Sequence, residues 1–189
     1  METQALLLAA TLQAGTVLAL AALGLLINEK SGVVNLGAEG MMLCAALAGF
    51  ATVVHTGSDM LGFLAGMGSG ALLAAVFGVL VIGLGTNAYA TGLALSLFGA
   101  GLSAFAGLSY VKEQLPDRVA YAVPYLSDLP WLGTALFKHH PLVYLAIALG
   151  LGLMLWLDRS RSGLILRAVG ESPESAHALG YRVRLIRMA

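Results

Sequence analysis

Long apolar segments dominate this chain and restrict how it can fold. A bilayer core about 30 Å thick is crossed by a helix of about 20 apolar residues. Five segments of the sequence reach or approach that length, namely 5–27, 33–54, 60–84, 87–111 and 142–157. Lipid offers no partners to backbone N–H and C=O groups, so each segment is expected to be a helix. The sequence predicts an all-α integral membrane protein, a polytopic helical bundle with about five transmembrane segments.

Charge is scarce and unevenly placed. Only 11% of the 189 residues are charged and 59% are hydrophobic, whereas soluble domains average roughly 25% charged residues. Six of the ten Lys and Arg residues follow Leu157: Arg159, Arg161, Arg167, Arg182, Arg184 and Arg187. Basic segments next to membrane spans stay on the cytoplasmic side. We therefore expect a transmembrane bundle over 1–157 and an Arg-rich cytoplasmic segment over 158–189.

The longest connection, 112–141, carries four of the five prolines together with Trp131, Tyr121 and Tyr125. Prolines and interfacial aromatics favour an ordered loop at a membrane surface. With five spans and a cytoplasmic 158–189, this loop and the N-terminus fall on the extracytoplasmic side. If segment 33–54 re-enters the membrane instead of crossing it, the N-terminus lies on the opposite side.

Small residues recur at helical spacing in two places. Gly62, Gly66 and Gly70 continue into Ala74 and Gly78, and Gly99, Ser103 and Gly107 form a second stripe. Small faces allow helices to approach closely in lipid, where no hydrophobic effect drives them together. We interpret both stripes as packing surfaces within the subunit, with a seam between subunits as the alternative.

The stretch INEKSGVVNLGAEGMM, residues 27–42, places polar side chains within a membrane-like run. Asn35 and Glu39 are four residues apart, so on a helix they share a face and are expected to point into the bundle. Intramembrane ionisable residues are candidates for a transport path. Alternatively, the pair is structural and holds a neighbouring helix or a broken helix end. The sequence leaves both readings open.

A short helix is predicted near the end of the sequence. Ser172 suits the N-cap, Pro173 the first helical position and Glu174 the positive end of the helix dipole. Gly180 suits the position just after a helix, so we expect a helix over 173–179. A helix this short is unstable alone and must dock on anionic lipid or on a protein.

Signatures of catalysis are missing from the sequence. It contains no GxxxxGK[ST] phosphate loop, no HExxH, no GxSxG and no paired Cys/His ligand set. The adjacent His139 and His140 do not share a helical face. We expect no enzyme activity, no ATPase motif of its own, no metal site and no cofactor.

Two stretches together resemble a known family: INEKSGVVNLGAEGMML and GLILRAVGESPESAHALGYRV. They look like the permease subunit of an ATP-binding-cassette importer of the branched-chain amino acid, ribose and nucleoside type. Within it, the resemblance is closest to the nucleoside (basic-membrane-protein-linked) and simple-sugar permeases. It implies a multi-pass subunit of a bacterial-type plasma membrane that translocates nucleosides or a related small solute. The implied partners are a cytoplasmic ABC ATPase, a second permease subunit and an extracytoplasmic solute-binding lipoprotein; nucleic acid is not among them.

The resemblance also implies where the ATPase docks. Glu174-Ser175-Ala176 followed by Gly180 resembles the EAAxxxG coupling loop, with Ser175 in place of its first alanine. The docking region would be 172–180 within a coupling loop over 158–189. The residues expected to serve coupling are Arg167, Gly170, Glu171, Pro173, Glu174, Ala176 and Gly180. Family members continue with further spans, so the sequence is expected to be a piece of a longer subunit.

Two other classes compete with this reading. A secondary transporter or channel would use Glu39 as an intramembrane ion or proton site, and inverted repeats would favour it, but no clear repeat is visible. A non-transporting membrane scaffold is the third class. The capped short helix discriminates, because a secondary transporter needs no docking helix for an ATPase.

Overall fold

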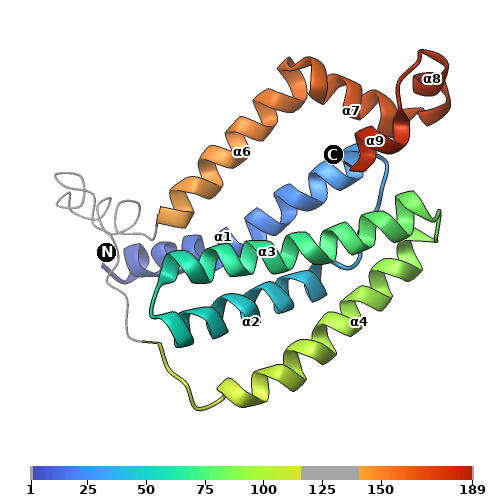
Figure 1. The fold of residues 1–189 in the computed structure, drawn as a ribbon. Coiled ribbons are helices and arrows are strands. Elements are labelled where there is room, and N and C mark those ends of the chain that lie inside the picture. The colour runs from blue at the N-terminus through green and yellow to red at the C-terminus, as the bar shows by residue number, and fades with distance from the viewer. Residues whose placement is uncertain (1, 116–140, 189) are drawn as a thin grey trace. The chain divides into compact units, whose positions relative to one another are not determined.

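The computed structural model describes residues 2–115 and 141–188. The described helices are α1 (Glu2–Lys30), α2 (Ala38–Thr56), α3 (Asp59–Gly78), the π-helical η1 (Val79–Gly83), α4 (Ala88–Gly107), the 3₁₀-helical η2 (Leu108–Tyr110), α6 (Pro141–Arg159), α7 (Arg161–Glu171), α8 (Pro173–Ala178) and α9 (Val183–Met188) (Figure 1). The described ranges contain no strand, which confirms the all-α prediction. Most of the predicted loop 112–141 lies outside the described residues.

Five helices are long and apolar enough to cross a membrane: Leu6–Lys30, Ala38–Thr56, Asp59–Gly83, Ala88–Tyr110 and Pro141–Arg159. Their number confirms the polytopic prediction. The second helix begins at Ala38 rather than at residue 33, and the fifth extends from Pro141 to Arg159. The division into a bundle over 1–157 and a cytoplasmic loop over 158–189 stays a prediction.

The chain forms two compact units. Among the described residues, the first comprises 2–26 and 141–164, and the second comprises 27–115 and 165–188. In the first unit α6 passes close to α1, where a Cβ on Gly150 would lie 3.9 Å from Cδ1 of Leu23. The second unit holds α2, α3 and α4 together with α8 and α9, and it contains every candidate site residue named above.

In the second unit, α2 packs against both α3 and α4 (Figure 1). Gly57, with φ of 68°, ends α2, and Ser58 caps α3 by accepting a hydrogen bond from the N–H of Leu61. A Cβ on Gly66 would lie 3.0 Å from the carbonyl oxygen of Ala45, and one on Gly62 would overlap the Val53 side chain. The first small-residue stripe therefore packs within the chain at these two glycines, as predicted.

The contact between α2 and α4 is closer still. A Cβ on Gly40 would lie 2.6 Å from the carbonyl oxygen of Leu95, and one on Gly99 would overlap the backbone of Gly40. Across the same contact Cys44 Sγ reaches the carbonyl oxygen of Gly99 at 3.7 Å. Such approach is available to glycine because it has no Cβ. Backbone contact, rather than interdigitated side chains, fixes α2 on α4.

The far end of α3 is irregular. The helix continues as η1, whose backbone follows the π-helical pattern, and the chain then turns at Gly85 with φ of 71°. Asn87 caps α4, its Oδ1 accepting hydrogen bonds from the N–H groups of Tyr89 and Ala90 at 3.0 and 3.1 Å. Single-turn π-helices often mark functional positions, and this one contacts α9.

Candidate functional site

Asn35 lies in the turn before α2, which begins at Ala38. The expectation that Asn35 and Glu39 share a helical face is therefore wrong. The chain leaves the α1 helix at Gly32, whose φ of 81° is open to glycine but costly for other residues. Asn35 Oδ1 then accepts the N–H of Gly37 at 2.9 Å, and Asn35 is only 7% exposed. This geometry supports the structural reading, in which Asn35 holds the start of a helix.

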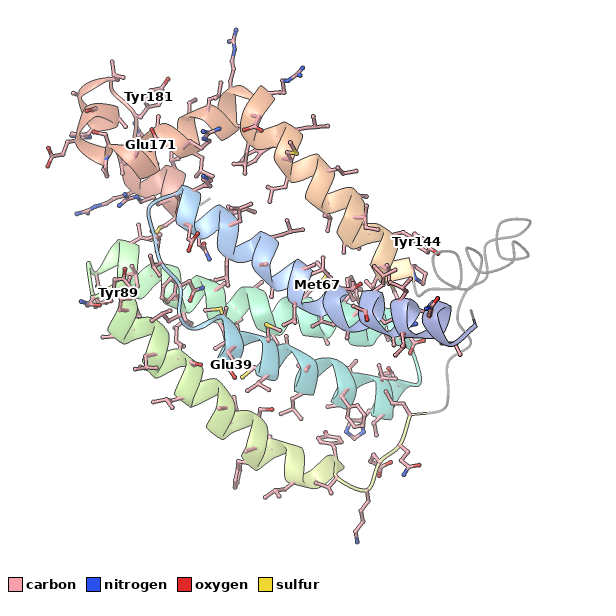
Figure 2. The ribbon with its side chains drawn as sticks, turned by 180° about the vertical axis from the view of Figure 1, so that it is seen from behind. Glu39, Met67, Tyr89, Tyr144, Glu171 and Tyr181 are labelled. Carbon is pink, nitrogen blue, oxygen red and sulfur yellow. The ribbon has the colours of Figure 1, made fainter. Side chains whose placement is uncertain are left out.

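Glu39 sits in the first turn of α2 and is exposed (Figure 2). A carboxylate there is favoured by the positive end of the helix dipole. Its exposure on this chain is compatible with a translocation path, which stays a prediction.

Replacing Asn35 by Ala should destabilise the protein, whereas Glu39→Gln should not. The Asn35 variant leaves the buried N–H of Gly37 unsatisfied, which costs about 1–3 kcal/mol. The Glu39 variant keeps an exposed polar side chain. Thermal unfolding in detergent measures both, and equal melting temperatures for the two variants would contradict the structural role of Asn35. An uptake assay on the folded Glu39 variant then tests the path.

The predicted short helix is confirmed as α8 (Pro173–Ala178). Ser172 Oγ accepts the N–H of Ser175 at 3.4 Å, and Pro173 occupies the first helical position. After the helix, Gly180 has φ of 88°, and its N–H donates to the carbonyl oxygen of His177 at 2.9 Å. The cap residues at both ends therefore act as their residue types predict.

The two faces of α8 differ. Ala176 is 3% exposed and packs inward, while Glu174 and His177 are exposed. Leu179, directly after the helix, is 77% exposed, and Tyr181 is 40% exposed. An exposed leucine and tyrosine beside a polar helix face form an amphipathic surface, here called the α8 surface (Glu174, His177, Leu179 and Tyr181). Sequence analysis missed its apolar part, although a leucine and a tyrosine on either side of the helix-ending glycine could have indicated it.

The predicted coupling residues separate into three groups. Glu171, Glu174 and Gly180 are exposed, Arg167 and Pro173 are half-buried, and Ala176 is buried. Gly170 packs within the chain: a Cβ there would overlap the carbonyl oxygen of Lys30 and lie 3.0 Å from the backbone nitrogen of Gly32. Figure 2 marks Glu171 near the end of α7 and Tyr181 beyond α8.

A groove of about 680 Å³ is lined by residues of η1, α8 and α9. Val81 and Ile82 of η1 contribute an apolar side, and Glu174, Arg182 and Arg184 contribute charge. The short helices α8 and α9 therefore lie beside η1 at the end of α3, and an open groove remains among these three helices.

Within residues 2–115 and 141–188, no three His, Cys, Asp or Glu side chains lie close enough together to hold a metal ion.

Three curated relatives match over nearly the whole chain. A putative glucose ABC transporter permease protein of Haloferax volcanii is 44% identical over 181 residues, covering 94% of this chain and 55% of the relative. A guanosine ABC transporter permease protein of Bacillus subtilis is 32% identical, covering 94% of this chain and 60% of the relative. A nucleoside ABC transporter permease protein of Lactococcus lactis is 31% identical, covering 92% and 58%. No solved structure matches.

The chain thus spans somewhat more than half the length of these relatives. Residues 7–189 match the family model described as branched-chain amino acid transport system / permease component. This match covers both stretches on which the resemblance was based and confirms it. The chain belongs to the branched-chain amino acid transport system permease family.

Proposed function

We propose that this chain is part of the membrane permease of an ATP-binding-cassette importer that translocates nucleosides or a related small solute. The α8 surface carries the proposal, because a capped, two-turn helix with an exposed Leu179 suits a cleft on a partner protein. The family and the names of the relatives, which refer to glucose, guanosine and nucleosides, support the class of solute.

ATP hydrolysis belongs to a separate cytoplasmic subunit in this proposal. The sequence carries no phosphate-binding loop, and permease subunits of this kind are generally not enzymes. A second permease subunit would complete the path, and a solute-binding lipoprotein would deliver the solute at the extracytoplasmic face of a bacterial-type plasma membrane. The exposed apolar faces of the long helices would contact lipid or that second subunit.

Closure of the ATPase would move α8 as a rigid body. Its capped ends hold the helix together, and α8 contacts α9, which in turn contacts η1 at the end of α3. Displacement of a short docked helix can thereby become displacement of a membrane helix. These contacts support the proposal that movement of α8 reaches the membrane helices.

Replacing Leu179 by Asp in the full-length permease should detach the ATPase. Removing an exposed apolar side chain from a docked interface and placing a charge there costs about 2 kcal/mol, or roughly thirtyfold in affinity. Co-purification of the ATPase with the permease measures the loss, and Glu174→Lys should act in the same direction. The matched control is Leu115→Asp, since Leu115 is an exposed leucine beyond η2 at the other end of α4.

The energy source that drives solute uptake distinguishes an ATP-driven importer from a secondary transporter or channel. A secondary transporter or channel with Glu39 as its ion site would continue to take up solute after ATP depletion, driven by an ion gradient. The importer proposed here stops when ATP is removed and is indifferent to dissipation of ion gradients. Competition between labelled guanosine and unlabelled glucose on the same vesicles then identifies the solute class.

A further inference from the structure

The guanidinium of Arg187 lies between the C-terminal ends of α1 and α7, and both of these ends belong to the second unit. Its Nε donates a hydrogen bond to the carbonyl oxygen of Ser31 at 2.9 Å, and Nη2 donates to the carbonyl oxygen of Val169 at 3.5 Å. Ser31 directly follows α1, and Val169 belongs to the last turn of α7. One side chain on α9 therefore joins two segments that are far apart in sequence.

Both carbonyl groups need an outside donor. The last four C=O groups of a helix have no partner within that helix. The N–H that would serve Val169 in a continued helix belongs to residue 173, which is Pro173 and has none. After α1 the chain departs from the helix at Gly32, with φ of 81°. A cation is also favoured at the negative end of a helix dipole, so Arg187 caps α1 and α7 together.

The two helix ends are also in direct backbone contact. A Cβ on Gly32 would lie 2.9 Å from Nη2 of Arg187 and 3.0 Å from the carbonyl oxygen of Gly170. Ser31 is 4% exposed and Val169 is 0% exposed. Ser31, Gly32, Val169, Gly170 and Arg187 thus form a closely packed contact, here called the Arg187 joint.

The joint connects α8 with the start of α2. Arg187 is on α9, which contacts both α8 and η1. Ser31 and Gly32 begin the turn that Asn35 closes before α2. If α9 follows α8, the two hydrogen bonds of Arg187 carry that movement to the end of α1 and on to α2.

We propose that Arg187 is a positioning residue that transmits movement of α8 to the α1–α2 turn, so that ATP hydrolysis drives solute movement. This inference rests on the proposed function, in which α8 docks the ATPase. A lysine cannot replace the arginine, because its ammonium group is a single point of charge whereas the planar guanidinium presents donors in a fixed fork. The role therefore depends on the shape of the side chain as well as its charge.

The test uses the full-length permease assembled with its ATPase and binding protein in lipid vesicles. Arg187→Lys and Arg187→Ala are compared with Arg184→Ala, which removes an exposed arginine from the same helix. Three quantities are measured: bound ATPase, ATP hydrolysis and solute uptake. Both Arg187 variants should keep the ATPase bound, while uptake per ATP hydrolysed falls roughly tenfold on loss of hydrogen bonds to a charged group. Arg184→Ala should change that ratio by less than about twofold.

An unchanged ratio of uptake to hydrolysis in both Arg187 variants would overturn the proposal. If the Arg187→Ala permease does not assemble with its partners, the result for Arg187→Lys decides alone. A lysine variant that also fails to assemble would reject a positioning role. A lysine variant with a normal ratio of uptake to hydrolysis would reject it as well. Failure of the proposed function is detected by a different experiment. In that case the ATPase would remain bound to the Leu179→Asp permease.

Discussion

A leucine at position 40 is expected to lower the melting temperature of the permease by at least about 5 °C in detergent. The Cβ alone would lie 2.6 Å from the carbonyl oxygen of Leu95 and 2.6 Å from Cα of Ser96. Both are backbone atoms of α4 and cannot rotate aside as a side-chain end would. Overpacking costs typically 1–3 kcal/mol, and a clash between two helix backbones belongs at the upper end.

Gly101→Leu is the control, since Gly101 lies on the partner helix α4 and a Cβ there would have nothing within 4 Å. Thermal unfolding followed by size-exclusion chromatography compares the two variants. Equal melting temperatures would show that α2 and α4 do not cross at Gly40. In the proposed importer the expected difference bears on transport, because this crossing fixes the helix that begins after the Asn35 turn and carries Glu39.

The number of membrane helices could be predicted because span length and apolarity are local properties of the sequence. The start of α2 could not be predicted in the same way. Val33, Val34 and Leu36 are as apolar as a helix interior, so hydropathy extends the span back to residue 33. The segment before Ala38 is not helical because Gly32 has a positive φ and because the side chain of Asn35 accepts a hydrogen bond from the backbone of Gly37.

The stripes of small residues predicted helix–helix contact correctly only at positions where a second helix lies close by. Gly62, Gly66 and Gly99 meet neighbouring backbone or side chains, whereas Gly78 has nothing within 4 Å. Periodicity describes one helix, but contact depends on where the partner helix begins and ends. The sequence of α3 alone does not contain that information.

In the candidate site, too, features set by neighbouring residues could be predicted, whereas contacts between residues far apart in the sequence could not. The α8 helix follows from Ser172, Pro173 and Gly180, each of which acts on its own neighbours. The Arg187 joint depends on a hydrogen bond to Ser31, 156 residues away. No spacing rule links two such positions, so Arg187 was recognised only as one member of a basic segment.

Gly170→Ala should open the Arg187 joint in the permease on its own, without any ATPase present. The added Cβ would overlap the carbonyl oxygen of Lys30 and lie 3.0 Å from the nitrogen of Gly32. If α7 moves away from the α1–α2 turn, Arg187 can no longer reach both Ser31 and Val169. Local opening then exposes α9, whose cleavage rate follows the population of the open form.

Limited digestion with trypsin reads this opening directly, because α9 contains Arg184 and Arg187. Cleavage there should accelerate roughly tenfold if the clash costs about 1.4 kcal/mol, while Ala168→Val, on an exposed position of the same helix, should not change it. The resemblance to coupling loops implies that Gly170 serves ATPase coupling. If it does so by contacting the ATPase, Gly170→Ala would weaken ATPase binding and leave cleavage of the isolated permease unchanged. Faster cleavage in the isolated permease would instead place Gly170 within the joint that holds α7 against the α1–α2 turn.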